Sequence, residues 1–411
     1  MTRTVAVTGI GMTTSLGPDV PTTWAAALAG KSGIRSLDTD WDDVYGLPVM
    51  FAGPIAGDPA AVLSRQESRR LDPAVQFALI SAREAWADAG SPDVAPERLA
   101  TVVATGIGGV WTFLNSWDTI RERGARRVLP TAVPMLIPNA AAAYLSMDFG
   151  AKAGAHAPVS ACAAGAEGIA QGADLIRMGR ADVVIAGGTD SSIHPCTIAG
   201  FAAMQAMSTR NDDPQGASRP YDVTRDGFVM AEGAGIVILE DAEHARARGA
   251  RVYAYVAGSG FTTDAFHIAA PDPSGEQQAA AMTKAMADAD LSPTDVVHIN
   301  AHATSTPVGD MIEAAAVVAA LGEDSAAVVS ATKSMTGHTL GAAGAIESIL
   351  TILALRDRQA PPTINVDQPE PDLAIDLVRN TPRPLPTGQI AAINNSFGFG
   401  GHNVAVVFTS A

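Results

Sequence analysis

Cys162 is the residue of this sequence whose surroundings best suit a nucleophile. It lies in PVSACAAGAEGIAQGADLIRMG (residues 158–179), where the end of an expected strand runs into an expected Gly- and Ala-rich helix. Unsatisfied backbone N–H groups and the dipole at the start of a helix stabilise a thiolate. A single cysteine without partners is more often a small buried apolar residue, so a catalytic role for Cys162 requires partners elsewhere in the chain.

Two of the eight histidines stand in segments that suit chemistry. His302, in INAHATSTPVGD (residues 299–310), ends an apolar run among hydroxyl side chains, where a strand would deliver it to a polar pocket. His338 lies in SATKSMTGHTLGAAGAIE (residues 330–347), near an expected helix start. Neither histidine has the helical spacing of a zinc site, so we predict no metal site. Two neutral imidazoles can instead donate hydrogen bonds to a developing oxyanion.

The segment around His338 also holds a cation and a carboxylate. Lys333 precedes His338 by five residues, and Glu347 follows it by nine. We expect Lys333 to orient His338 or to pair with Glu347.

A third segment with chemical potential is NNSFGFGGHN (residues 394–403), which follows the expected strand QIAAI. Its Gly-rich turn surrounds Phe397 and Phe399. Backbone N–H groups of such a turn could line an oxyanion site while an aromatic ring moves as a gate. The alternative is a plain hairpin near the end of the chain.

Two further segments match known functional motifs only in part. Residues 9–11, Gly-Ile-Gly, begin like a dinucleotide-binding fingerprint, but Thr14 occupies the third glycine position and no acidic residue follows at the required distance. Ser330 and Lys333 match the S-x-x-K pattern of acyl-serine enzymes, but S-D-N and K-T-G are missing. We therefore expect neither a nucleotide site nor a serine nucleophile.

Composition narrows the classes of protein further. The net charge of −16 over 411 residues argues against binding to nucleic acid or to an anionic membrane, because polyanions are bound through clustered Lys and Arg. No apolar run has the length of a membrane span, and the first residues lack the pattern of a signal peptide, so we expect a cytoplasmic protein. Two cysteines are too few for a disulfide framework.

The elements that must position these residues follow an α/β pattern. Short β-rich runs such as TVAVTGI, DVVIAGG and VVHINAH alternate with Ala-rich helical stretches, which predicts a buried sheet wrapped by helices. Apolar residues at helical spacing from Leu71 to Trp86 predict an amphipathic surface helix that ends at Gly90.

A faint internal repeat suggests two related halves. Residues 5–14 (VAVTGIGMTT) align with residues 254–263 (AYVAGSGFTT) at five of ten positions. Residues 159–161 also align with residues 329–331, which places Cys162 opposite Thr332. We predict an N-terminal half over residues 1–250 that carries the nucleophile, and a C-terminal half over residues 251–411 that carries the two histidines.

Small residues form stripes along the two expected helices that follow these positions. The stripes comprise Gly165, Gly168, Gly172 and Gly179 in one half, and Gly337, Gly341, Gly344 and Ser348 in the other. Glycine costs roughly 1 kcal/mol relative to alanine inside a helix, so a stripe indicates close approach by another element. We expect the two helices to pack at the centre, with Cys162 and His338 facing one cavity.

Taken together, these segments closely resemble the β-ketoacyl-acyl carrier protein synthases. The resemblance rests on SACAAGAEG, NAHATSTPVGD, KSMTGH, GAAGAIE and NNSFGFGG, in that order, and on GIGG (residues 106–109) and RPYDVTRDGFVMAEGAG (residues 219–235). It covers nearly the whole chain and is strongest to the type II elongating enzymes. It implies a thiolase-like fold, in which two duplicated α/β halves form five layers, and a homodimer.

The resemblance also implies roles for individual residues. Cys162 would hold the acyl group as a thioester, while His302 and His338 would promote decarboxylation of a malonyl thioester. The supporting pair would be Lys333 and Glu347. The oxyanion hole would be formed by backbone N–H groups of Cys162 and Phe399, and Phe399 would also be the gate. The implied substrate-binding residues are Thr304, Thr306, Ile107, Phe201 and Gly400.

The implied partner is an acyl carrier protein, which brings its own phosphopantetheine, so we expect no resident cofactor. Arg65, Arg69, Arg70, Arg126 and Arg127 match family positions that dock this acidic carrier. Local charge can outweigh the net charge of −16 because the Debye length is about 8 Å at physiological salt. The alternative is a solvated helix face whose arginines are offset by Glu67.

The sequence departs from the family pattern at a few positions. Ala303 follows His302 and Ala231 precedes Glu232 where glycine is usual, and Ala269 and Ala270 replace hydroxyl residues. The last two put one contact to the pantetheine arm in doubt.

Two related kinds of protein share much of this pattern. The catalytic ketosynthase subunit of a type II polyketide system, which forms a heterodimer with a chain-length partner, uses the same Cys-His-His set. The non-catalytic chain-length subunit is disfavoured by Cys162, and a thiolase would need a second cysteine near the C-terminus.

Overall fold

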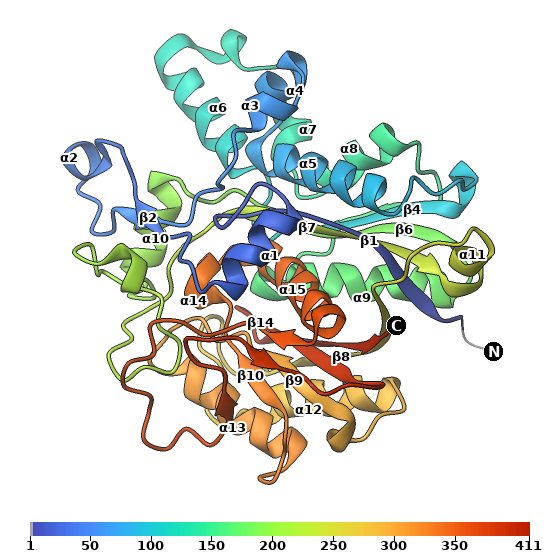
Figure 1. Ribbon diagram of the computed structural model, residues 1–411. Helices are drawn as coiled ribbons and strands as arrows, with labels where there is room; N and C mark the ends of the chain where they lie inside the picture. The colour runs from blue at the N-terminus through green and yellow to red at the C-terminus, as the bar shows by residue number, and fades with distance from the viewer. Residues whose placement is uncertain (1–2) are drawn as a thin grey trace.

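Eleven strands run in one hydrogen-bonded order across the molecule (Figure 1). The computed structural model describes residues 3–411. The first five strands, from the outer edge inward, are β5 (Ala155–His156), β4 (Leu99–Ala104), β6 (Val183–Asp190), β7 (Gly233–Asp241) and β1 (Val5–Thr13). The order continues with β8 (Ala254–Thr263), β15 (His402–Ser410), β14 (Ala391–Gly398), β9 (Val296–Asn300), β10 (Val328–Ser330) and β12 (Asp376–Leu377).

The two groups of strands are paired in the same way on either side of the β1–β8 contact. β7 runs antiparallel to both β1 and β6, and β15 runs antiparallel to both β8 and β14. The outer strands of each group are parallel. Only Val5–Val7 of β1 pair with β8, so this short antiparallel contact joins two otherwise separate sheets.

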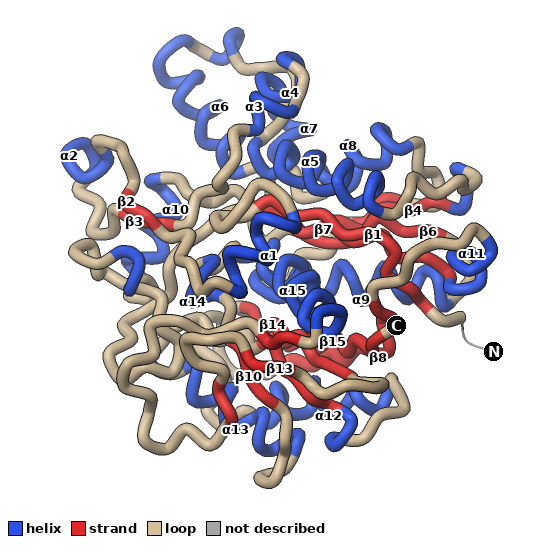
Figure 2. Tube along the Cα trace, viewed as in Figure 1, coloured by secondary structure: helices blue, strands red, loops and turns tan. Residues whose placement is uncertain are grey.

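Helices form the other three layers. α9 (Ala164–Arg177) and α15 (Ala343–Asp357) lie between the two sheets (Figures 1 and 2). α5 (Pro73–Asp88) and α8 (Ala140–Phe149) cover the outer face of the N-terminal sheet, and α12 (Glu276–Asp288) and α13 (Gly309–Leu321) cover that of the C-terminal sheet. The architecture is therefore the expected thiolase-like α-β-α-β-α arrangement.

The remaining helices and short strands lie outside the five layers. The other helices are α1 (Val20–Leu28), α2 (Trp41–Tyr45), α3 (Pro59–Val62), α4 (Arg65–Arg70), α6 (Val110–Arg123), α7 (Ala132–Leu136), α10 (Pro195–Ala203), α11 (Ala242–Ala247) and α14 (Lys333–Thr336). β2 (Arg35–Ser36) pairs with β3 (Phe51–Ala52), and β11 (Gln359–Ala360) pairs with β13 (Arg383–Pro384). The predicted boundary at residues 250–251 falls between α11 and β8. Within residues 3–411, none of the helices has the length and apolar content to cross a bilayer.

The repeat between residues 5–14 and 254–263 has a structural basis. These residues form β1 and β8, and their glycines meet the outer helices in the same way: a Cβ on Gly9 would collide with the carbonyl oxygen of Ala85 in α5, and a Cβ on Gly258 with that of Ala285 in α12. The glycine two residues later in each strand repeats this contact one helical turn away. Each half therefore needs two glycines so that a helix can approach its inner strand.

The alignment of Cys162 with Thr332 is wrong. Ala161 and Leu340 both have a φ of 50°, and each begins the 3-10 turn that leads into a central helix. The glycines of those helices also face each other, since a Cβ on Gly165 would touch the Ala345 backbone and one on Gly344 would touch the Ala166 backbone. The counterpart of Cys162 is therefore Gly341. Gly165 and Gly344 thus confirm the expected packing of the two helices, while Gly168 and Gly172 face β6, so the close neighbour there is a strand.

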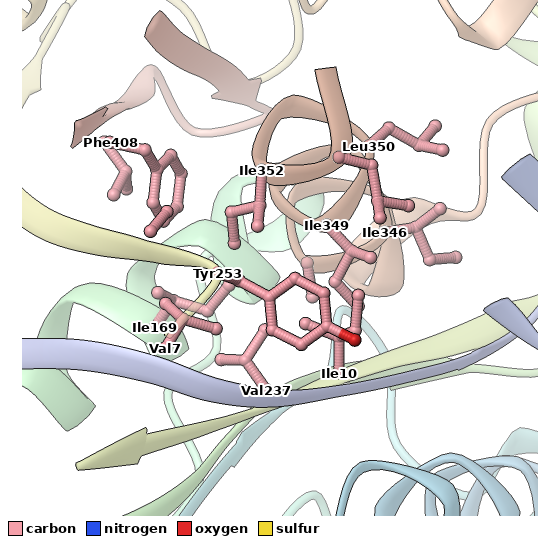
Figure 3. Close-up of a cluster of buried hydrophobic side chains, with 14 of the residues drawn as sticks. Val7, Ile10, Ile169, Val237, Tyr253, Ile346, Ile349, Leu350, Ile352 and Phe408 are labelled. Atoms are coloured by element: carbon pink, nitrogen blue, oxygen red, sulfur yellow. The ribbon is translucent and has the colours of Figure 1, made fainter. Parts of the chain in front are cut away.

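The core is centred on α15. Figure 3 shows Ile346, Ile349 and Ile352 of this helix among side chains of the flanking strands, including Val7 and Val237. All these side chains are buried. Burying each aliphatic side chain contributes about 1.5–3 kcal/mol, so this helix holds the two sheets together.

The predicted helix between Leu71 and Gly90 differs from the structure in two respects. Asp72 caps α5, and Pro73 occupies its first turn, so Leu71 instead ends the separate helix α4. Proline suits the first turn of a helix but not its interior, which explains the break. Nine residues of α5 are buried against the sheet, so it is an outer layer of the fold and not an ordinary surface helix.

Candidate active site

Cys162 lies at the point where the chain enters the central helix α9. It belongs to the 3-10 turn Ala161–Ala163, and its side chain is buried, with 8% of the residue exposed. Its Sγ is 3.0 Å from Nε2 of His338. The positive φ of Ala161 strains the backbone just before the nucleophile, as in other turns that present a reactive side chain.

The backbone of His338 is held on both sides of its peptide by the segment 228–231. Its N–H donates to the carbonyl oxygen of Val229 at 2.7 Å, and its own carbonyl oxygen accepts from Ala231 N at 2.9 Å. The ring of Phe228 packs edge-on against the imidazole, with 5.5 Å between ring centroids. The segment 228–231 therefore fixes the imidazole opposite Cys162.

His302 follows the end of β9, where the C-terminal sheet opens toward the same space. Its ring stands nearly perpendicular to that of His338, with the centroids 5.5 Å apart. Glu313 of α13 accepts hydrogen bonds from the backbone N–H groups of His302 and Ala303 at 2.8 and 2.7 Å. Ala303, which stands where the family usually has glycine, has a φ of 22°, and the Glu313 contact holds this strained backbone in place.

Lys333 was expected either to pair with Glu347 or to orient His338, and the structure shows the pair with Glu347. The Nζ to Oε1 distance is 2.6 Å, and both side chains are almost fully buried. The other expectation, that Lys333 orients His338, is wrong. Lys333 Nζ instead donates to the His302 carbonyl oxygen at 2.6 Å and lies 3.4 Å from its Nδ1.

Burial and Lys333 together keep both imidazoles neutral. Desolvation, and to a lesser extent the Lys333 charge, holds the pKa of His302 and of His338 well below 6.5. A neutral imidazole can donate one N–H to an oxygen that becomes negative, and this is the state that such a role requires.

The thiol does not behave as the helix start alone suggested. Burial raises the pKa of Cys162 to about 11, although the Lys333 charge and the backbone N–H groups of Phe399 and Cys162 act in the opposite direction. The expectation of a resting thiolate is therefore wrong for the free protein, because desolvation outweighs those contacts. The same two N–H groups are, however, placed to receive negative charge next to the sulfur.

The Gly-rich segment is a hairpin and also part of the site. β14 continues to Gly398, beyond the expected strand, and residues 399–401 turn the chain into β15. Phe399 and Gly401 line the cavity. Gly400, which the resemblance assigned to substrate binding, is not among the lining residues, and its N–H donates to the carbonyl oxygen of Ile268 at 2.8 Å.

A cavity of about 640 Å³ opens above Cys162 and holds the remaining predicted residues. The two imidazoles, Thr304, Thr306, Ile107 and Phe201 all line it. The ring of Phe201 lies 6.3 Å from that of Phe399, so aromatic side chains connect the turn to the deeper wall. This volume and its largely apolar wall suit a flexible, mostly hydrocarbon substrate.

The other departures from the family pattern are accommodated locally. The Ala231 methyl group faces Gly53 and Gly337, two residues without side chains. Ala269 and Ala270 line the cavity, and their N–H groups donate to Nδ1 of His267. His267, not a hydroxyl, thus orders this part of the wall.

Sequence reasoning missed the buried groups that hold the histidine loop. Asp310 accepts hydrogen bonds from Ser305 N and Thr306 N, and Arg225 donates to the carbonyl oxygens of Thr306 and Pro307. A signal was available, because two carboxylates, Asp310 and Glu313, lie three residues apart where the His302 motif ends, which is the start of α13.

The five arginines lie away from the cavity, on exposed elements. Arg65, Arg69 and Arg70 belong to α4, and Arg126 and Arg127 to the 3-10 turn after α6, and all five are exposed. Glu67 does not offset α4, because its carboxylate bonds Arg83 at 2.7 Å and the Ser64 backbone at 2.8 Å. These contacts lower the pKa of Glu67 to about 2, and Arg83 in turn bonds Asp148 of α8.

Comparison with known families gives matches along most of the chain. The beta-ketoacyl synthase N-terminal domain matches residues 2–245, and the beta-ketoacyl synthase C-terminal domain matches residues 253–367. The two matches together leave residue 1, residues 246–252 and residues 368–411 outside.

Relatives and solved structures agree with these matches. The chain is 47% identical to 3-oxoacyl-[acyl-carrier-protein] synthase 2 of Mycobacterium tuberculosis, and 46% identical to that of Mycobacterium leprae, over 98% of this chain and 96% of each relative. A beta-ketoacyl synthase from Burkholderia phymatum superposes with a TM-score of 0.91 at 33% identity, over the full length of both chains. A type II polyketide ketosynthase, solved with its acyl carrier protein and a hexaketide, has a TM-score of 0.91 at 31% identity and full coverage of both chains.

Proposed function

Since the chain belongs to the beta-ketoacyl synthase family, we propose that it elongates a fatty acyl chain by two carbons through decarboxylative Claisen condensation. The observation that carries this proposal is the meeting of three side chains from two halves of the molecule: Cys162 Sγ 3.0 Å from His338, with His302 against the same imidazole. The 47% identity to 3-oxoacyl-[acyl-carrier-protein] synthase 2 over nearly the whole chain supports the fatty-acid pathway.

The first step transfers an acyl group from its carrier to Cys162. The sulfur attacks the carbonyl carbon of the carrier thioester, and the new C–S bond forms as the bond to the carrier sulfur breaks. The proton that Cys162 loses ends on the departing thiol, while the neutral His338, whose Nε2 lies 3.0 Å from Sγ, keeps its own N–H for the next step. The negative oxygen of the tetrahedral intermediate accepts hydrogen bonds from Cys162 N–H and Phe399 N–H.

The second step removes carbon dioxide from a malonyl thioester. The bond between the carboxylate carbon and the α-carbon breaks, and its electron pair passes to the thioester oxygen as an enolate. His302 and His338, both neutral, donate hydrogen bonds to that oxygen and stabilise its charge. Lys333, which donates to the His302 carbonyl and lies beside its Nδ1, holds this imidazole with its Nε2 toward the cavity.

The third step joins the two carbon chains. The enolate carbon attacks the acyl carbonyl on Cys162, and collapse of the tetrahedral intermediate expels the Cys162 sulfur and releases a β-ketoacyl carrier thioester. The expelled sulfur takes up a proton, which its raised pKa favours. The high pKa that slows formation of the thiolate therefore helps to return the enzyme to its resting state.

A product assay tests the proposed function. The purified chain, given an acyl carrier protein loaded with a saturated acyl group and a second loaded with malonate, is expected to form a β-ketoacyl carrier protein two carbons longer and one carbon dioxide per turnover. Mass spectrometry of the carrier proteins measures both. Absence of a longer product across acyl groups of several lengths would overturn the proposal.

We propose that an acyl carrier protein docks on the exposed arginines of α4 and of the turn after α6. The polyketide ketosynthase with which this chain superposes was solved in complex with its acyl carrier protein. Acidic carriers would be attracted to this local positive charge although the whole chain carries −16. The Arg83 ion pairs with Glu67 and Asp148 keep α4 fixed, so its arginines face solvent from a rigid base.

Reversing the charge of α4 is expected to weaken carrier binding without affecting chemistry. The triple variant Arg65→Glu, Arg69→Glu and Arg70→Glu should raise the KM for acyl carrier protein about tenfold or more, leave kcat within about twofold, and lose most of this effect at high salt. Steady-state kinetics at two ionic strengths measure this. A matched control reverses Arg180, Arg246 and Lys284, which are exposed elsewhere, and should change KM little. Equal effects from the two triple variants would contradict docking at α4.

We propose that the functional unit is a homodimer. β5 is the outermost strand of its sheet and leaves an edge that a second copy could extend. Phe113, Trp117 and Ile120, spaced by four and three residues along α6, are each at least 41% exposed and form an apolar stripe. Large exposed apolar stripes mark protein contacts, and a second copy is the partner that the family resemblance implies.

We do not favour the alternative function, that of the catalytic ketosynthase subunit of a type II polyketide system. The polyketide ketosynthases superpose well, but at 30–31% identity, whereas the fatty-acid relatives reach 47%. A cytoplasmic location and the lack of a resident cofactor, with phosphopantetheine brought by the carrier, stay predictions from the sequence.

A further inference from the structure

A buried carboxylate that the mechanism above does not use lies next to the active site. Asp190 ends β6 and is fully buried. Its Oδ2 accepts hydrogen bonds from Gly106 N at 2.8 Å and from Gly341 N at 2.6 Å. Its Oδ1 accepts from the Thr105 hydroxyl at 2.6 Å and, less closely, from Ile107 N at 3.4 Å.

These four donors belong to two loops that meet in the cavity wall. One loop follows β4 and carries Gly106 and Ile107, both of which line the cavity. The other begins the central helix α15, and its Leu340 also lines the cavity. Asp190 is thus the junction that fixes the distance between two parts of the wall.

Gly341 is packed so closely against Gly106 and Asp190 that its loop cannot move without displacing them. A Cβ on Gly341 would collide with Gly106 N and lie 2.6 Å from Asp190 Oδ2. The Gly341 carbonyl oxygen packs against Gly165 of α9 and against Gly188, so the same loop also touches the helix that carries Cys162. A shift of Gly341 therefore moves the wall relative to the sulfur.

We propose that Asp190 is a positioning residue that sets the acyl chain on Cys162 by fixing Ile107 and Leu340 in the cavity wall. The proposal rests on the proposed condensation and adds a residue to it. His338 is held separately, by the backbone of Val229 and Ala231, so Asp190 governs the acyl group and not the decarboxylation of malonate.

The Thr105 hydroxyl connects Asp190 to the loop after β4, so a substitution at Thr105 also perturbs this junction. The Thr105 hydroxyl donates to Asp190 and accepts from Gly108 N at 2.9 Å. Gly108 has a φ of 89°, a conformation that favours glycine, so this hydroxyl also holds a constrained loop.

The test compares acyl loading with decarboxylation. In Asp190→Asn one of the two acceptor oxygens becomes an N–H₂ donor, so the donors on that side lose their acceptor, and loading of Cys162 from acyl carrier protein is expected to slow about 10- to 100-fold. In a Cys162→Gln background, the same change should leave decarboxylation of malonyl carrier protein within about twofold. Thr105→Val, which leaves the carboxylate in place, should slow loading about threefold to tenfold. Thr105→Val therefore tests the same junction if Asp190→Asn does not fold.

An independent readout is the pH dependence of Cys162 alkylation. The charged groups that act on this sulfur are Lys333, which lowers its pKa, and Asp190, which raises it. Asp190→Asn should therefore move the midpoint of the alkylation profile to lower pH, and Lys333→Met should move it to higher pH. Thr105→Val loosens the same junction but keeps the Asp190 charge, so it should leave the midpoint unchanged; an equal downward shift in Thr105→Val would instead indicate better solvation of the sulfur.

Glu84→Gln is the matched control, because Glu84 is a half-buried carboxylate that also accepts two backbone N–H groups, from Met12 and Val20, away from the cavity. It should leave the ratio of loading to decarboxylation unchanged. Loading at the wild-type rate in both junction variants would overturn the inference, as would an equal fall in loading and decarboxylation. Failure of the unmodified protein to load any acyl group would instead refute the proposed function.

Discussion

Cys162→Ala is expected to reduce condensation to background, a loss of at least about 10⁴-fold, because the acyl group then has no covalent attachment. The alanine fills the same buried turn with a smaller apolar side chain, so the fold should persist. The measurement is formation of β-ketoacyl carrier protein from acyl and malonyl carrier proteins. Cys196→Ala is the control, since this exposed thiol at the start of α10 makes the same chemical change outside the cavity, and it should retain full activity.

Cys162→Gln separates decarboxylation of the malonyl thioester from acylation of the enzyme. It removes the nucleophile but leaves His302 and His338 in place, so release of carbon dioxide from malonyl carrier protein should continue. Its side-chain carbonyl can also accept the two backbone N–H groups that an acyl thioester would use. Elongation by either Cys162 variant at an appreciable rate would exclude the covalent mechanism.

Replacing either imidazole is expected to have the second largest effect. His302→Ala and His338→Ala should each slow decarboxylation about 10²- to 10³-fold, the usual cost of one lost donor to a developing oxyanion. The assay is carbon dioxide release from malonyl carrier protein in the Cys162→Gln background, where acylation does not interfere. His302→Gln should recover part of the rate because its amide can still donate a hydrogen bond.

The pH dependence of that assay provides a further check on the same pair. Because the pKa values of both imidazoles lie well below 6.5, the neutral donors persist as the pH falls, and the rate should stay level from about pH 8 to about pH 6. A histidine with an ordinary pKa would lose its neutral form over that range. His244→Ala, which changes a histidine on α11 that does not line the cavity, should behave as the unmodified protein. A rate that halves near pH 6.5, or alanine variants with full activity, would contradict the assigned role.

Much of the fold could be predicted from sequence because its constraints are local. The glycines shared by residues 5–14 and 254–263 mark the inner strand of each half, since only glycine allows the outer helix to come so close. The break between α4 and α5 was also readable, because Asp72 and Pro73 form a standard helix start. It was overlooked since the apolar spacing continues through it.

Other features depend on contacts that sequence order does not reveal. The alignment of Cys162 with Thr332 followed strand ends, whereas the true match to Gly341 depends on a positive φ at Ala161 and Leu340. Similarly, a thiolate was expected from the helix start, but the pKa of the thiol depends on how deeply it is buried. Asp190 was invisible to motif analysis because its partners lie some 85 and 150 residues away along the chain.

The most direct test of the account is intact-protein and peptide mass spectrometry after incubation with acyl carrier protein alone. One acyl group per chain is predicted, located on Cys162, and it should leave when malonyl carrier protein is added, as the product two carbons longer appears. An acyl group on another residue, or full turnover with Cys162 never acylated, would contradict the mechanism built on this sulfur and the two imidazoles beside it.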